Sequence, residues 1–334
     1  MIAARLTPSL DDARFVRALV VATPGLGLVA GVAAAALPGA WPWILGADLW
    51  LLSFPHVAST FTRTAFRADD RRQHRALLVA LPVAAVALSA ALAGVGGVGL
   101  LTTVYFFWQS FHYLRQSRGI HRALRQAAGR SPDDPLSDAV LHLVALWCLL
   151  HRCAQGPRLF FGAPLWVPAV PRAAVSLAAV VAFGAPAAWV VRAVREGLSE
   201  DGARDAGHRA YVMGHVAVFL AGYVVIPDAT RAWIAVNVWH NAQYLLFVWA
   251  WNRRRFARSP GDGPLAWLCA PGRGAWLYAV CAALGGALYA LVGLTAGLAL
   301  ALPLYAVLVQ AVNFHHYVAD TVLWRAPRQR ASSV

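Results

Sequence analysis

The sequence predicts an all-α fold, a polytopic integral membrane bundle of about ten transmembrane helices with both termini on the cytoplasmic side. Composition is the first reason, because 59% of the 334 residues are hydrophobic and only 13% are charged. A soluble domain is nearer about half apolar and about a quarter charged. Apolar stretches of about 20 residues, enough to cross the hydrocarbon core, recur along the chain. No segment between them is long enough to fold alone, so residues 1–334 form one transmembrane domain.

The apolar stretches predict where each membrane-spanning helix lies. The first follows three arginines and is long enough to remain as an anchor, unlike a cleavable signal. We expect spans at residues 15–37, 42–63, 76–95, 100–119, 137–154, 172–193, 210–226, 231–252, 274–293 and 297–322.

Loop charge gives the orientation. Arginines cluster in alternate loops, whereas the loops between them, including the glycine-rich 94–99, carry few or none. The positive-inside rule then places the arginine-rich loops and both termini in the cytoplasm, and we expect the bacterial inner (cytoplasmic) membrane. The arginine-rich segments are 63–75, 115–130, 195–209, 253–258 and the C-terminal tail.

The net charge of +14 does not indicate nucleic-acid binding, because the charges lie in short clusters between apolar stretches. Membrane lipids are the partners that this distribution predicts, and a soluble, acidic electron donor is a further candidate for the basic loops. The cysteines form no CxxC pair and lie in or beside apolar stretches, so they are interpreted as small hydrophobic residues: Cys148, Cys153, Cys269 and Cys281.

The spans are of two kinds. Those at 15–37, 76–95, 172–193 and 274–293 are almost free of polar residues and are expected to form a shell facing lipid. The others carry His, Asn, Gln, Asp and many aromatic residues, and polar groups at membrane depth usually face a bundle interior. We therefore expect an inner bundle made of 42–63, 100–119, 137–154, 210–226, 231–252 and 297–322.

The histidines of these inner spans converge at one depth. Counted at about 1.5 Å per residue from the nearest arginine-rich loop, most lie a few turns inside the cytoplasmic boundary, with His240 somewhat deeper. Neutral imidazoles in an apolar medium need partners, and a metal ion satisfies several at once. The predicted ligands are His56, His112, His142, His215, His240, His315, His316 and Asp320.

Neighbouring polar residues are candidates for orienting these ligands. Asp138 and His142 are four residues apart on one helical face, as are His316 and Asp320. A ligating histidine usually donates its second N–H to a carboxylate, amide or carbonyl. The predicted supporting residues are Asp138, Gln109, Asn237, Asn241 and Asn313. The remaining histidines, His74, His121, His151 and His208, are expected to be solvated or interfacial.

A polytopic chain with histidines near the cytoplasmic face resembles the histidine-rich membrane metallo-oxygenases. Desaturases and fatty-acid hydroxylases use paired motifs such as HxxxH and HxxHH, whereas this sequence has a single HH, at His315 and His316. Its dispersed, one-per-helix pattern is closer to the Brp/Blh carotene dioxygenases. The resemblance implies a di-iron oxidoreductase acting on a lipid, fatty acyl chain, isoprenoid or carotenoid.

Other functions are compatible with the same residues. Iron, with two ions, is the expected cofactor, and zinc, copper or haem are alternatives. A haem cytochrome would use one or two axial histidines, and a zinc hydrolase would use metal-bound water. A transporter would use the polar layer as a permeation site. A single histidine in a membrane helix is also more often a hydrogen-bond partner between helices than a ligand.

Overall fold

A computed structural model describes residue 10 and residues 12–197, 205–258, 263–298 and 302–324. The described residues are almost entirely helical, as predicted. Five helices are long and apolar enough to cross a membrane: Ala13–Ala36, Arg75–Ala127, Pro135–Ala154, Arg172–Gly197 and Gly274–Gly297. Both chain termini, predicted to be cytoplasmic, lie outside the described residues.

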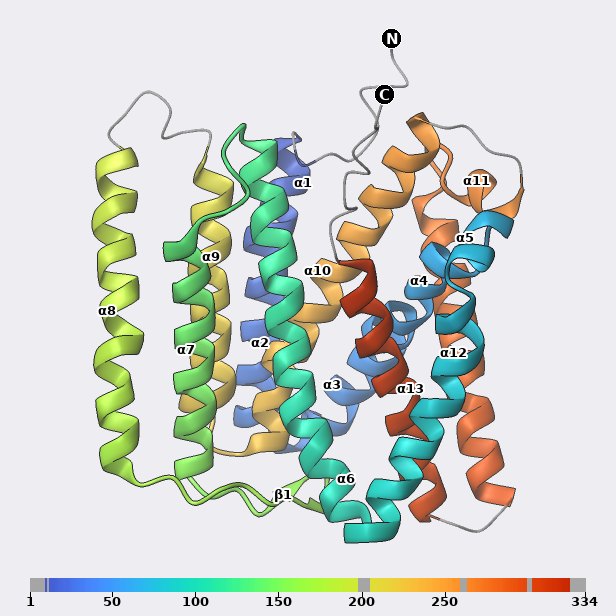
Figure 1. Cartoon of the computed structure of the whole chain (residues 1–334), viewed down its shortest axis with the longest axis horizontal. Coiled ribbons are helices and arrows are strands. Elements are labelled where there is room, and N and C mark those ends of the chain that lie inside the picture. Colours follow the sequence, from blue (N-terminus) through green and yellow to red (C-terminus); the bar gives the residue numbers. More distant parts are fainter. Residues whose placement is uncertain (1–9, 11, 198–204, 259–262, 299–301, 325–334) are drawn as a thin grey trace, which may run out of the picture.

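Long helices lie roughly side by side and form a bundle (Figure 1). The first is built from α1 (Ala13–Arg17), a π turn η2 (Ala18–Ala22) and α2 (Thr23–Ala36), and the second from α3 (Trp41–Asp48), a π turn η4 (Leu49–Ser53) and α4 (Phe54–Thr64). The short η3 (Pro38–Ala40) joins them. Then follow α5 (Ala68–Gln73), α6 (Arg75–Ala127), α7 (Pro135–Ala154), α8 (Arg172–Gly197), α9 (Ala206–Leu220) with the π turn η6 (Ala221–Val225), α10 (Ala229–Arg258), α11 (Pro264–Leu268), α12 (Gly274–Leu298) and α13 (Leu302–Leu323).

Helix α6 contains the reversal that the sequence predicts as a loop. Gly96 and Gly97 have non-helical backbone angles, and Gly97 has a φ of 63° that favours glycine. The two arms of α6 therefore run in opposite directions and meet at the bottom of the molecule (Figure 1). The glycine-rich segment 94–99 is thus a sharp bend within an otherwise helical stretch, not an extended loop.

Strands occur among the described residues only as a short antiparallel hairpin between α7 and α8. β1 (Leu159–Phe160) pairs with β2 (Ala163–Pro164), with Phe160 opposite Ala163. The turn places Phe161 and Gly162 at positive φ, and the Phe161 N–H donates to the Thr230 hydroxyl at the start of α10. The hairpin therefore covers the lower end of the bundle interior (Figure 1).

The division into shell and inner helices holds for α8 but not for α2. α8 lies at the edge of the bundle beside α7 (Figure 1). In α2, by contrast, Gly27 and Gly31 are buried against α10, where a Cβ on Gly27 would lie 2.5 Å from the Ala235 carbonyl oxygen. Small residues let the two helix backbones approach closely. The first predicted span is therefore a packing partner of the inner bundle, not only a shell helix.

Candidate metal centre

Four buried histidines from four helices meet in the bundle interior. They are His56 on α4, His112 on the second arm of α6, His240 on α10 and His316 on α13, and each offers one ligand atom within 4.8 Å of the others. Their exposed fractions are only 2–3%. The four residues are all among the predicted ligands. We call them the four-histidine group.

The nitrogens face one another in pairs. Nε2 of His56 lies 2.7 Å from Nε2 of His316, and Nε2 of His112 lies 3.1 Å from Nε2 of His240. Nitrogen ligands about 2.1 Å from a first-row metal lie roughly 3.0–3.4 Å apart in octahedral or tetrahedral geometry. The 3.1 Å separation of His112 and His240 falls in this range, whereas the 2.7 Å separation of His56 and His316 lies just below it, so that pair would have to open slightly to share an ion. The chemistry of the donors also fits, since neutral imidazole binds iron, copper and zinc.

A chain of hydrogen bonds fixes the orientation of one of these rings. The Tyr244 hydroxyl donates to Asp320 Oδ1 at 2.6 Å, so its oxygen accepts the Thr60 hydroxyl proton at 2.9 Å. Thr60 is then free to accept from Nδ1–H of His316, 3.0 Å away. This direction leaves the lone pair of His316 on Nε2, which faces His56 and the rest of the group. Such a buried, directed network sets the tautomer of a ligand.

Asp320, a predicted ligand, stands next to the group without joining it. Its Oδ2 lies 3.8 Å from Nε2 of His316 and has no hydrogen-bond partner among the described residues. Nδ1 of His56 and Nδ1 of His240 also lack partners. Buried polar atoms are normally paired, and a cation held by the group would give the unpaired Asp320 oxygen a partner. The two Nδ1 atoms point away from the Nε2 contacts and do not bear on that ion. The carboxylate could compensate part of the charge of a cation held by the neutral imidazoles.

A cavity of about 480 Å³ opens directly onto the group. Three of the histidines line it, His56, His240 and His316, and its volume is in the range of sites for small molecules. Most of the wall is apolar or aromatic. The hairpin residues Phe160 and Phe161 close the lower end of the wall, and Tyr305 of α13, 45% exposed, stands at its border. A lipophilic molecule in this cavity would lie against the four-histidine group.

Comparisons provide no relative for this site. No family model, no curated protein and no solved structure matches the chain. The chemistry must therefore be argued from the residues themselves.

Most of the predicted supporting residues line the cavity or surround it without bonding a ligand ring. Gln109 accepts a hydrogen bond from Trp233 Nε1, and the single proton of the Tyr113 hydroxyl is donated to Asn237 Oδ1, at 3.0 Å, with Gln109 Oε1 farther away at 3.4 Å. Asn241 donates to Ser53 of η4, and Asn313 donates to Gln310 and accepts from Tyr289. These side chains form a polar strip in the cavity wall and its surroundings. Gln116, which was not among them, holds the His240 backbone by donating to its carbonyl at 3.0 Å.

Three predicted ligands lie elsewhere. His142 Nδ1 pairs with the Asp138 carbonyl at 2.6 Å, and His215 lies between the Ser117 hydroxyl and the Leu141 carbonyl. His315 points about 100° around α13 from its neighbour His316, and its Nε2 pairs with the Leu77 carbonyl at 2.8 Å. The structure therefore does not bring His142, His215 and His315 into the four-histidine group. They are hydrogen-bond partners between or within helices.

His121 and His208 are buried, which corrects the prediction that they are solvated or interfacial. Their exposed fractions are 0% and 2%, and His121 Nδ1 lies 2.9 Å from His208 Nε2. Asp138 lies 3.4 Å from the other nitrogen of His121, and Asp205 lies 3.3 Å from the other nitrogen of His208. Burial lowers the pKa of His208 against the opposing effect of Asp205. Asp138 thus serves this second pair and Arg118, and not the four-histidine group.

Two functional candidates, Thr60 and Asp48, escaped the sequence analysis, whereas Tyr244 shares a helical face with His240 and can be recognised from that spacing. Thr60 and Tyr244 each lie four residues after a histidine of the group, a spacing that puts them on the same helical face. Asp48, on α3, is 3% exposed, accepts from Asn237 at 2.6 Å and leaves Oδ1 without a partner among the described residues. It is the only carboxylate in the predicted span 42–63, and a carboxylate at membrane depth is itself a signal of function.

Proposed function

We propose that this chain is a membrane-embedded, metal-dependent oxidoreductase that acts on a lipophilic substrate held in the cavity beside the four-histidine group. One observation carries the proposal: three of the four histidines form part of the wall of an aromatic cavity, so the candidate metal centre and the candidate substrate site are adjacent. A redox-active ion there would sit against the carbon skeleton of a lipid, isoprenoid or carotenoid. The resemblance to the Brp/Blh carotene dioxygenases agrees with this substrate class.

The ligand set favours one iron ion in place of the two expected from the sequence. The other three predicted histidine ligands bond elsewhere, so a second ion would lack imidazole ligands from them. Four imidazoles on an octahedral ion leave two positions for other ligands. When bound, the ion would supply the redox chemistry. The chain itself binds the substrate, excludes water with apolar walls and fixes His316 through Thr60.

Haem is a poorer fit than a bare ion. Two axial histidines of a haem lie on opposite faces of a wide macrocycle. Here the ligand atoms of all four rings lie within 4.8 Å of one another, so the other two imidazoles would occupy the plane of the porphyrin. Zinc remains the alternative that would convert the proposal into hydrolysis by metal-bound water.

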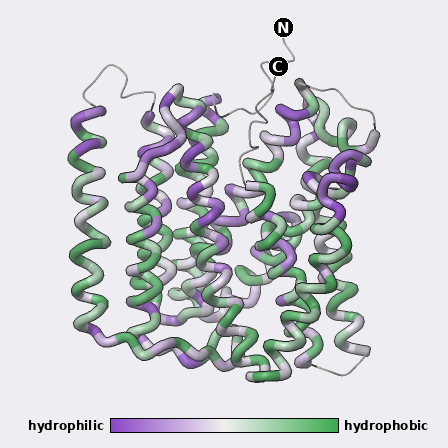
Figure 2. The backbone as a smooth tube through the Cα atoms, in the orientation of Figure 1, coloured by the Kyte–Doolittle hydropathy of each residue, from purple (hydrophilic) through white to green (hydrophobic). Residues whose placement is uncertain are grey.

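The proposed setting is the bacterial inner membrane with the ten predicted crossings. Hydrophilic residues gather towards the upper ends of the helices in Figure 2, where the arginine-rich segments around α5 and the end of α10 also lie. The positive-inside rule makes that side cytoplasmic. The inner helices can span although they are less apolar, because their polar side chains face the cavity and the histidines rather than lipid.

Elemental analysis of the protein purified without added metal, together with its optical spectrum, tests the proposal. We expect about one iron per chain, no Soret band, and loss of the iron in His112→Ala and His316→Ala. The matched controls are His142→Ala and His215→Ala, which remove a predicted ligand that lies outside the group and should keep the iron. Equal loss in all four variants, or a Soret band, would overturn the proposed centre.

Turnover separates oxidation from hydrolysis. The iron-loaded protein, mixed with a lipid extract, a reductant and isotopically labelled O2, should place label in a lipid product. Zinc as the sole metal, with product formed equally well without O2, would replace the oxidoreductase by a hydrolase.

A further inference from the structure

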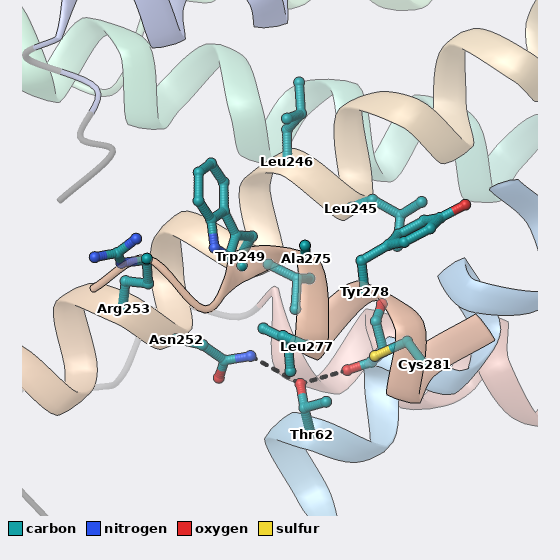
Figure 3. Close-up of a pocket in the computed structure, with 14 residues that line it drawn as sticks. Thr62, Leu245, Leu246, Trp249, Asn252, Arg253, Ala275, Leu277, Tyr278 and Cys281 are labelled. Carbon is teal, nitrogen blue, oxygen red and sulfur yellow. Dashed lines mark hydrogen bonds between the residues drawn. The ribbon is translucent and has the colours of Figure 1, made fainter. Parts of the chain in front are cut away.

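A second cavity lies between α4, α10 and α12, away from the walls of the first. Its volume is about 400 Å³ and its lining is almost wholly apolar. Figure 3 shows Trp249 and Arg253 of α10 towards one end and Tyr278 of α12 at the other, with Leu246, Leu277 and Cys281 among the residues between them. α10 ends a few residues after Arg253, in the arginine-rich segment predicted to face the cytoplasm. The cavity therefore reaches the level of lipid headgroups.

The arginine at the end of this cavity has no counter-ion among the residues that the structure describes. Arg253 is 5% exposed, and its Nε and Nη2 have no hydrogen-bond partner among the described residues. These two nitrogens lie on one edge of the guanidinium, the edge that binds a carboxylate or phosphate with two parallel hydrogen bonds. Trp249 Nε1, a third donor lining the cavity, is also unpaired.

No described residue supplies a negative charge to Arg253. The side chain lies 5.7 Å from the centre of the Trp249 ring, and the described titratable group that acts on it is Cys269. Burial raises the pKa of Cys269 to about 12, so this thiol is neutral. Arg255, two residues later, has the usual carboxylate partner, since both of its Nη atoms donate to Asp70. A buried cation without such a partner is costly, and an anion in the cavity would remove that cost.

We propose that this cavity binds an anionic amphiphile: its oxyanion, a carboxylate or phosphate, pairs with Nε and Nη2 of Arg253, and one alkyl chain fills the apolar space between α4, α10 and α12. The apolar lining excludes a free inorganic anion as the natural occupant, because such an ion would leave most of the cavity unfilled. The volume holds one chain, so the source is a fatty acid or one chain of an anionic phospholipid.

Native mass spectrometry of the delipidated full chain tests the site with three probes: oleate, dioleoyl phosphatidylglycerol and inorganic phosphate. We expect saturable binding of at least one of the two lipids, and whichever binds more tightly identifies the source. Arg253→Gln should weaken that binding tenfold or more, as expected for a charge-assisted pair. Ala275→Trp, which fills the cavity and keeps the arginine, should weaken it as well.

Arg72→Gln is the matched control, because it removes the same charge from an exposed position on the same side of the protein. It should leave lipid affinity unchanged. Arg253→Gln should not lower the melting temperature of the lipid-free protein, because Nε and Nη2 bond no other described residue and the substitution removes an uncompensated buried charge. Unchanged lipid affinity in Arg253→Gln, an equal loss in Arg72→Gln, or phosphate binding as tightly as the lipids would overturn the proposal. The metal content plays no part in this measurement.

Discussion

Thr60→Val is the sharpest test of how the four-histidine group is oriented. The substitution keeps the shape of the side chain and removes the hydroxyl that lies 3.0 Å from His316 Nδ1 and 2.9 Å from the Tyr244 oxygen. Without that acceptor, nothing in the chain from Asp320 directs the ring proton to Nδ1. A partner of this kind is worth about 10–100-fold in metal affinity, or about 1.4–2.7 kcal/mol.

The assay is a competition titration, in which a chelator of known affinity removes the metal from the purified protein. Thr64→Val is the matched control: Thr64 is buried on the same helix, and its hydroxyl donates only to the Thr60 carbonyl, away from the histidines. We expect a higher Kd for the metal, and so weaker binding, in Thr60→Val and an unchanged Kd in Thr64→Val. Equal affinities for Thr60→Val and the wild type would refute the directed chain, as would an equal fall in both variants.

Two further predictions concern the packing of the bundle. Burial acts to raise the pKa of Asp134, but the paired hydrogen bonds from Arg192 outweigh it and hold that pKa well below the usual range. Asp134→Asn should therefore lower the unfolding free energy by about 1–3 kcal/mol at pH 7. Denaturation at several pH values should show this loss of stability shrinking only below about pH 4, where the carboxylate of the unfolded wild-type chain begins to be protonated. Gly27→Ala should cost about 1–3 kcal/mol, because its new Cβ would meet the Ala235 carbonyl, whereas Gly25→Ala, with nothing within 4 Å, should cost none; melting temperatures in one detergent decide both.

Depth could be predicted from the sequence, but direction around each helix could not. Distance from an arginine-rich loop predicts that most inner histidines lie in one layer, with His240 somewhat deeper, and four of them do meet: His56, His112, His240 and His316. His215 shares that layer on α9, yet it faces the Ser117 hydroxyl and the Leu141 carbonyl. Which faces point at each other depends on the arrangement of the helices, and the π turn η4, just before α4, further alters the register ahead of His56.

Hydropathy alone also misplaces the boundary between shell and interior. The segment 15–37 is nearly free of polar groups, so it reads as a helix in contact with lipid. Its glycines, however, allow α2 to lie against α10 at a distance that larger side chains would prevent. Likewise His121 sits in an arginine-rich segment but is fully buried, because α6 continues to Ala127 and carries it against α9. In both cases the close packing of helices, and not the polarity of the segment, determines whether a residue is buried.

A local pattern separates the four-histidine group from the other inner histidines. Each member is followed four residues later by a polar side chain, in the pairs His56 and Thr60, His112 and Gln116, His240 and Tyr244, and His316 and Asp320. In the three predicted ligands that lie elsewhere, this position is apolar: Leu146 after His142, Phe219 after His215 and Ala319 after His315. Residues four apart share a helical face, so a polar pair marks a face that is polar over more than one turn. At membrane depth such a face usually points into the protein, and in this fold the four faces meet, which is where an ion and its supporting hydrogen bonds can be held.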